Sequence, residues 1–233
     1  MFRYLAGLGV LFFVWLVPVT LSHAGLVFEF AVGGVAQSSI NIAGVGQTVD
    51  IQVYLRQTDG ETILTNEWLL TAGIKVTFDN PAVAAVLTTG DIQENPLFDD
   101  SELFAKAVTG TTAELDGAVD LSSPTVFPTV SDPDRIWLGT FTFTGLALGS
   151  TTISVTDLDP TEFADEIITG SLNPLDALIT PGSATLTVTP EPGSIALSLL
   201  MIGAASVVTT YRRRRRRSVQ EAGEACPAGG ATL

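Results

Sequence analysis

The C-terminal end of the chain places the strongest constraint on how the rest can fold. Residues 193–211 form an uncharged, mainly apolar run, and six arginines follow it directly. As a helix, this run would be about 28 Å long, close to the roughly 30 Å hydrocarbon core of a bilayer. Arginines beside a membrane span remain on the cytoplasmic side. We therefore expect one transmembrane helix, with the preceding chain outside that membrane, oriented by Arg212, Arg213, Arg214, Arg215, Arg216 and Arg217.

A short motif, Pro190-Glu191-Pro192, stands immediately before the apolar run. The order of this motif, one apolar span and an arginine cluster resembles the PEP-CTERM sorting signal of exported bacterial proteins. The resemblance covers residues 190–217 and implies a partner, an exosortase-type sorting enzyme that reads the motif and processes the chain near it. An ordinary single-pass anchor is the alternative. Residues 218–233 have the polar, Gly- and Ala-rich composition of a disordered cytoplasmic tail.

The N-terminus has the three parts of a secretory signal peptide. Arg3 supplies the positive charge, residues 5–21 are apolar, and Ser22-His23-Ala24 offers small residues at the cleavage positions. We expect residues 1–24 to be removed between Ala24 and Gly25, with an uncleaved second membrane helix as the alternative. The exported domain would then comprise residues 25–189.

The composition of this domain excludes several classes of function. Of the 25 acidic residues, only Glu191, Glu221 and Glu224 lie outside it, whereas its basic residues are four, so its net charge is −18. Nucleic acid is excluded because phosphate binding requires a positive surface. The domain contains no cysteine and no histidine, which excludes disulfides, Ser-His-Asp and Cys-His catalysis and the usual zinc sites. The four basic residues are Arg56, Lys75, Lys106 and Arg135.

Alternating apolar and polar residues predict short strands throughout the domain. In residues 48–56, Val49, Ile51, Val53 and Leu55 share one face, as in a strand with one buried side. We expect further strands at 26–32, 70–78, 135–143, 150–155 and 184–188, a turn at 59–60 and a helical turn at 82–86. Residues 88–133 are either a loop or short strands. Because no helix of ten residues fits, the pattern predicts an all-β protein, an antiparallel β-sandwich.

Four segments of the domain, residues 46–48, 74–83, 139–143 and 149–153, resemble the cohesin-type jelly roll and related carbohydrate-binding modules. The most specific segment is the strand end Phe78-Asp79-Asn80-Pro81. The resemblance implies a jelly-roll sandwich that docks to a partner through one face. The resemblance does not identify any individual binding residue in this chain.

Two binding sites are conceivable within the domain. Asp157 and Asp159 alternate along an extended segment, so their carboxylates could bind Ca²⁺, helped by Asp165 or by Asp132 and Asp134. Flat aromatic rings stack on sugars, and Tyr54 is the stronger sugar-binding candidate. Trp68 and Trp137 are weaker candidates, since Trp137 is in phase with Phe141 and Phe143 and is expected in the core.

Together these features predict an exported, membrane-tethered binding or structural module without catalytic activity. We expect it at the inner membrane before processing, and in the cell envelope or extracellular matrix afterwards. Its expected partners are the sorting enzyme, the membrane, and a polysaccharide or another surface protein. The alternative is a polysaccharide-acting enzyme that works through two carboxylates, because a glycosidase needs only such a pair.

Overall fold

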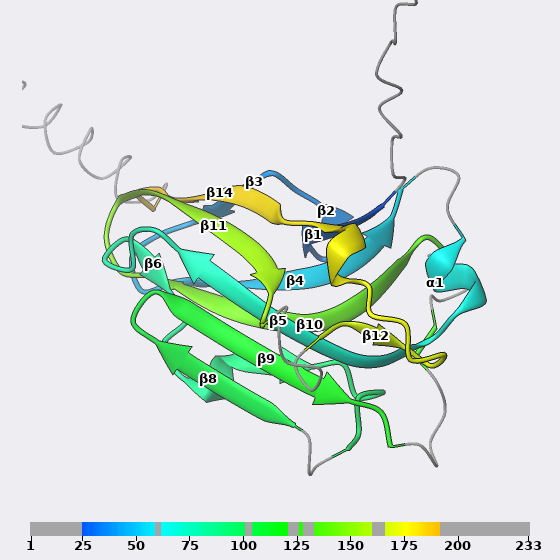
Figure 1. The fold of residues 1–233 in the computed structure, drawn as a ribbon. Coiled ribbons are helices and arrows are strands. Elements are labelled where there is room, and N and C mark those ends of the chain that lie inside the picture. The colour runs from blue at the N-terminus through cyan, green and yellow to red at the C-terminus, as the bar shows by residue number, and fades with distance from the viewer. Residues whose placement is uncertain are drawn as a thin grey trace, which may run out of the picture.

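Two β-sheets packed face to face make up the domain (Figure 1). The computed structural model describes residues 25–58, 62–100, 104–120, 126–127, 133–159 and 166–191. Within these residues the helical segments are short: α1 (Ile63–Asn66), η1 (Thr89–Asp91) and η2 (Asp176–Leu178). The expectation of an all-β sandwich is confirmed.

The first sheet has the strand order β13-β1-β4-β10-β6, with β2 paired to β1 and β7 paired to β10. Its strands are β1 (Leu26–Val32), β2 (Val35–Ala36), β4 (Thr48–Gln57), β6 (Ala84–Ala85), β7 (Ile92–Glu94), β10 (Arg135–Gly145) and β13 (Ile179–Thr180).

The second sheet has the order β3-β14-β11-β5-β9-β8, with β12 paired to β5. Its strands are β3 (Ser39–Ile42), β5 (Leu69–Phe78), β8 (Ala105–Thr109), β9 (Thr112–Ala118), β11 (Gly149–Asp157), β12 (Ile168–Thr169) and β14 (Gly182–Val188).

Most strand pairs are antiparallel, as the sequence predicts, but two pairs at the sheet edges are parallel. β13 lies parallel to β1, and β3 lies parallel to β14. Each parallel pair joins a strand near the start of the domain to one near its end, so neither pair needs a short hairpin connection. The expected antiparallel sandwich is therefore confirmed except at these two edges.

The core lies between the sheets and is built by period-two alternation. In β4, Ile51, Val53 and Leu55 are fully buried, while the residues between them are only partly buried. Phe78 from the second sheet meets Phe143 from the first edge to face, with ring centroids 5.6 Å apart. This geometry is favourable for aromatic pairs and links the two layers.

A β-bulge in β10 overturns the expected core position of Trp137. Trp137 lies opposite Tyr54, but Gly139 is already opposite Val53, so Leu138 is the extra residue. One inserted residue reverses the alternation of the strand. Phe141 consequently faces the core, whereas Trp137 shares the outer face of the sheet with Tyr54.

Two further local expectations change, and a third is resolved between its two alternatives. Leu69 is buried and Leu70 only partly so, the reverse of the expected phase at the start of β5. Residues 81–83 form a turn rather than a helix, and Ala84 and Ala85 then pair with the end of β10. Of the two alternatives for residues 88–133, short strands are correct where the structure describes them, because β7, β8 and β9 fall there. The predicted turn at 59–60 lies outside the described residues.

The domain begins and ends at opposite ends of the sandwich (Figure 1). Gly25 is tied to Thr58 at one end, and Thr189 is tied to Ile42 at the other. No helix within the described part of the chain is long and apolar enough to cross a membrane. Both predicted membrane-targeting segments, residues 1–24 and 193–211, lie outside that part.

Candidate functional surfaces

The predicted sorting motif begins where the folded domain ends. β14 finishes at Val188, and the Thr189 amide donates to the Ile42 carbonyl at 3.0 Å. Pro190 and Glu191, which follow, are exposed. Another protein can therefore contact Pro190 and Glu191 from solvent while β14 stays folded. Pro192 and the arginines Arg212 to Arg217 lie outside the described residues, as does Ala24 of the predicted cleavage site.

A glycine accommodates the chain at this exit. A Cβ atom on Gly44 would lie 2.7 Å from Cγ of Glu191, closer than carbon atoms approach in proteins. The Glu191 side chain thus packs over the loop between β3 and β4. The sequence alone places Glu191 in the motif but gives no sign of this neighbour, because Gly44 is distant along the chain.

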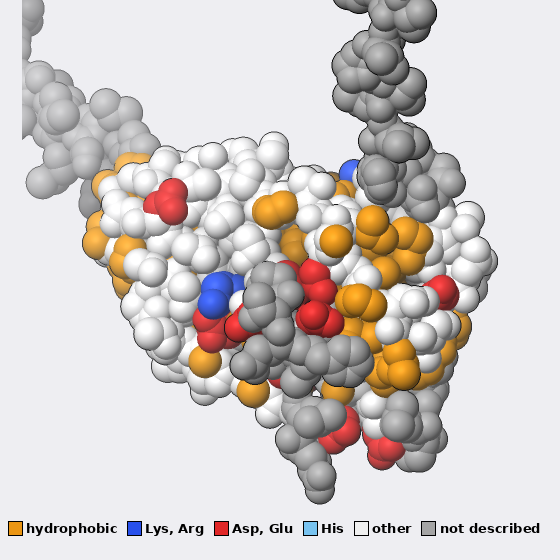
Figure 2. Space-filling view, viewed as in Figure 1, with side chains coloured by type: hydrophobic (Ala, Val, Ile, Leu, Met, Phe, Trp, Pro, Cys, Tyr) orange, Lys and Arg blue, Asp and Glu red, His pale blue; other side chains and the backbone are white. Residues whose placement is uncertain are grey.

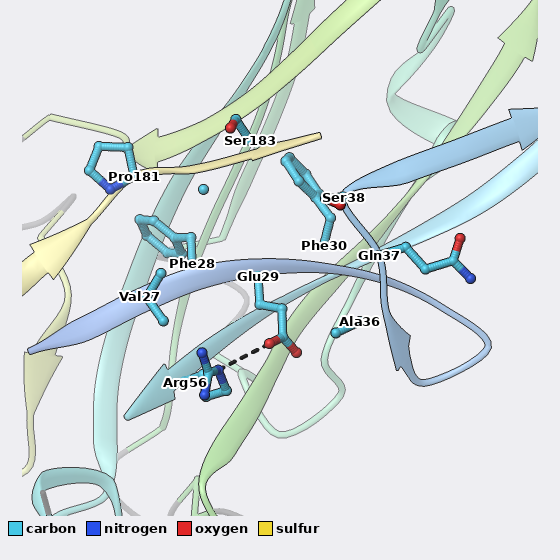
Figure 3. Close-up of a pocket in the computed structure, with 11 residues that line it drawn as sticks. Val27, Phe28, Glu29, Phe30, Ala36, Gln37, Ser38, Arg56, Pro181 and Ser183 are labelled. Carbon is cyan, nitrogen blue, oxygen red and sulfur yellow. Dashed lines mark ion pairs between the residues drawn. The ribbon is translucent and has the colours of Figure 1, made fainter. Parts of the chain in front are cut away.

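A groove of about 350 Å³ opens where the edge of β1 meets the start of β14 (Figure 3). The two strands approach so closely that a Cβ on Gly182 would lie 2.4 Å from the Phe28 carbonyl oxygen. Only glycine fits at this position. The groove is lined by Val27, Phe28, Glu29, Phe30, Ala36, Gln37, Ser38, Arg56, Pro181, Gly182 and Ser183. The lining combines apolar residues with polar and charged ones, a mixture that is typical of binding clefts.

One wall of the groove carries a network of ion pairs. Glu29 accepts a hydrogen bond from Arg135 Nη1 at 2.7 Å, and its second carboxylate oxygen forms an ion pair with Arg56, lying 3.0 Å from Nε. Arg135 Nη2 also donates to the Gly34 carbonyl at 2.6 Å. Two guanidinium groups therefore share one carboxylate, which holds Arg135 in place and leaves Arg56 the more exposed of the two.

Tyr54, the predicted sugar-binding residue, belongs to the same network. The guanidinium carbon of Arg135 lies 4.2 Å from the centre of the Tyr54 ring, a cation–π contact. This contact occupies one face of the ring, so a sugar would have to stack on the other face or displace Arg135. Sugar binding by Tyr54 stays a prediction. Trp68 packs its indole against Gly170, where a Cβ would lie 2.0 Å from the ring.

Asp157, one of the two predicted calcium ligands, ends β11 and faces a second cavity of about 310 Å³. The cavity is also lined by Asp176, whereas Asp159 does not line it. Neither oxygen of Asp157 meets a hydrogen-bond donor among the described residues. Burial, together with the negative charge of Asp176, raises the pKa of Asp157 to about 7.

Asp176 is the neighbour that sequence reasoning missed. It lies in η2 and accepts a hydrogen bond from the Ile167 amide at 3.1 Å. No pattern in the sequence joins it to Asp157, because the strand pairing and the loop after β12 bring them together. No group of three or more acidic, His or Cys side chains within the described residues has metal-binding geometry. Of the additional ligands proposed from sequence, Asp132 and Asp165 lie outside that part of the chain, and Asp134 accepts a hydrogen bond from Gln57 Nε2 at 3.4 Å.

The comparisons with known proteins identify no family. No protein-family model and no curated protein matches the chain. Among solved structures, CaCohA2 in its complex with a variant of CaDoc0917 is 14% identical with a TM-score of 0.45, covering 70% of this chain and 99% of that one. The solution structure of CaCohA2 from Clostridium acetobutylicum is 13% identical with a TM-score of 0.44, covering 71% and 91%.

A further similar structure is the sixth cohesin of scaffoldin B from Acetivibrio cellulolyticus, solved in complex with a Cel5 dockerin mutant. It is 13% identical with a TM-score of 0.44, covering 71% of this chain and 98% of that one. The assignment of this domain to a two-sheet sandwich rests on its own strand pairing.

Proposed function

We propose that this protein is an exported, membrane-tethered binding or structural module without catalytic activity, delivered by a PEP-CTERM-type signal. The observation that carries the proposal is the exposed Pro190-Glu191 pair, which directly follows the backbone hydrogen bond from Thr189 to Ile42. In sequence, Pro192, the apolar run and the arginines come next. A sorting enzyme needs an accessible, extended segment, and prolines favour that conformation.

Each targeting segment acts at one stage of export and processing. Residues 1–24 direct export and are removed before Gly25. Residues 193–211 then hold the precursor in the inner membrane, with the arginines in the cytoplasm. After processing near Glu191, the acidic domain resides in the cell envelope or extracellular matrix, where its net charge of −18 favours solubility.

Replacing Glu191 by Ala tests the sorting step in a host that carries the matching sorting enzyme. We expect unprocessed precursor to accumulate in the membrane, because the motif's only charged side chain is lost while the apolar span remains. The control replaces Arg212 to Arg217 by Asn, which should disturb orientation or retention under either interpretation. An unchanged ratio of precursor to processed protein in Glu191→Ala would leave only an ordinary anchor.

The groove between β1 and β14 is the proposed binding surface of the module. Its lining includes the polar and charged residues Glu29, Arg56, Gln37, Ser38 and Ser183 beside apolar ones. Such side chains suit the hydroxyl and amide groups of a polysaccharide or of another surface protein. Replacing Arg56 by Ala should weaken binding of the polysaccharide or surface protein. The control Lys75→Ala, on the second sheet, should leave that binding unchanged.

A carboxylate-dependent enzyme is the second candidate, and the Asp157–Asp176 pair is the observation that favours it. A carboxyl group with a raised pKa beside a second carboxylate is a typical acid and base pair. Against it, the oxygens of Asp157 have almost no solvent-accessible area with which to reach a substrate. Turnover on an oligosaccharide panel that is lost in Asp157→Asn would establish the enzyme, whereas binding without turnover supports the module.

Calcium binding at the same place is a separate proposal. The two carboxylates and the absence of a donor for Asp157 among the described residues support it, because Ca²⁺ prefers carboxylate oxygens. Calcium should then raise the melting temperature of the wild type but not of Asp157→Asn. Equal melting curves with calcium and with a chelator would exclude a site that stabilises the fold.

A further inference from the structure

The end of the sandwich from which the chain leaves carries an apolar tip, formed by residues 43–47 and 146–148. These two loops contain no charged residue, although the domain as a whole has a net charge of −18. Val45 is 51% exposed, Leu146 41% and Leu148 55%. Figure 2 shows hydrophobic side chains gathered at the left end of the molecule, the end at which β14 finishes.

Hydrogen bonds hold the two loops of the tip together. The Gly46 amide donates to the Gly145 carbonyl at 2.7 Å, and the Gly145 amide donates to the Gln47 carbonyl at 2.9 Å. The Leu146 amide donates to the Val83 carbonyl at 2.7 Å. These hydrogen bonds fix the two loops relative to each other, so their apolar side chains form one surface.

The chain leaves the domain directly beside this tip. Thr189 is bonded to Ile42, the residue before the first tip loop, and the Glu191 side chain packs over Gly44 within that loop. From Thr189 to Gly193, where the apolar run begins, an extended chain reaches at most about 14 Å. The polar layer on each side of a bilayer is roughly 5–7 Å thick. A domain tethered this closely cannot move far from the membrane surface.

We propose that the apolar tip docks into the headgroup layer of the membrane that anchors the precursor, with Val45, Leu146 and Leu148 inserted. This inference rests on the proposed membrane anchor. Asp79, which is exposed after β5, and Glu191 are carboxylates at the same end, so the surface suits zwitterionic rather than anionic lipid. Docking places Pro190 and Glu191 at the depth where a membrane-embedded sorting enzyme acts.

A single fluorophore on the full-length protein tests the docking. Leu148→Cys is made in a Cys226→Ser background, labelled with an environment-sensitive dye, and reconstituted in phosphatidylcholine and phosphatidylethanolamine vesicles. The matched control is Leu172→Cys, which is 59% exposed and follows β12 near the start of β5, away from the tip. We expect a blue-shifted emission at position 148, quenched by headgroup-region spin-labelled lipid, and an aqueous emission at position 172.

The same samples separate failure of the tip from failure of the anchor. If the protein floats with the vesicles after alkaline extraction but position 148 behaves like position 172, docking is overturned and the anchor stands. If the protein does not float, the anchor and the docking are overturned together. In the triple variant Val45→Ser/Leu146→Ser/Leu148→Ser, we expect cleavage of the Pro190–Glu191 bond by an added proline-specific endopeptidase to accelerate by about threefold or more. An unchanged cleavage rate would contradict docking.

Discussion

At the scale of single residues, Asp157 lies in an unusual environment for a carboxyl group. Burial and the neighbouring charge of Asp176 raise its pKa to about 7, from an ordinary value of 3.8. The folded chain therefore binds this proton more tightly than the unfolded chain does. The stabilisation is complete below pH 3.8 and is lost as the pH rises through 7.

Asp157→Asn removes this pH dependence. In chelator, we expect the variant to be more stable than the wild type at pH 8 by about 1–2 kcal/mol, less than the full pKa shift implies because Asp157 as a whole residue is only partly buried. Denaturant unfolding between pH 4 and pH 8 measures the difference. Asp79→Asn, an exposed aspartate after β5, is the control. A variant less stable than the wild type at pH 8 would contradict the account.

Arg135 makes several contacts that should stabilise the fold. Arg135→Ala removes a cation–π contact, one hydrogen bond and one ion pair, all in a part-buried setting. We expect a loss of about 1–3 kcal/mol in unfolding free energy. Lys75→Ala breaks the more exposed pair with Glu114 and should cost less than about 1 kcal/mol. Equal losses in the two variants would show that the Arg135 contacts contribute no more to the unfolding free energy than an exposed ion pair does.

The sequence grouped Asp157 with Asp159, whereas the cavity beside Asp157 is lined by Asp176 and not by Asp159. Alternation suggested Asp159, yet β11 ends at Asp157, so the strand geometry does not extend to Asp159. Asp176 approaches from a different part of the chain. Local spacing predicts which side of a strand a residue occupies, whereas contacts between distant segments depend on the strand order, which spacing does not encode.

At the scale of elements, alternation predicted the long strands well and failed where the alternation is interrupted. The expected strands at 26–32, 48–56 and 184–188 agree with β1, β4 and β14 to within two residues at either end. In β10, the bulge at Leu138 reverses the phase and turns Trp137 outward. The two-residue strands β2, β6, β12 and β13 are too short for any alternation to show.

The close approach of β1 and β14 depends on Gly182. In Gly182→Ala, the added Cβ would meet the Phe28 carbonyl oxygen at 2.4 Å, so one of the two strands must move. We expect a loss of about 2–3 kcal/mol and a change in the groove between these strands. Gly90→Ala, where the nearest atom would be 3.4 Å away, is the control and should be nearly neutral. Equal effects in thermal unfolding would contradict the proposed contact.

At the scale of the whole molecule, the domain has a continuous core between its two sheets and needs no membrane segment to complete it. Residues 25–191 should therefore fold alone. We expect a soluble monomer with a β-type circular dichroism spectrum and one cooperative unfolding transition. A helical spectrum, or a fragment that remains unfolded, would contradict the described fold.

The central claim is that the domain is exported and then released from, or processed at, its C-terminal signal. Intact-mass and terminal-peptide mass spectrometry of the protein from membrane, envelope and medium fractions tests it most directly. The account predicts a mature N-terminus at Gly25 in every fraction, and a C-terminus near Glu191 in the processed form outside the membrane. Recovery of only the intact chain, from Met1 to Leu233, would contradict it.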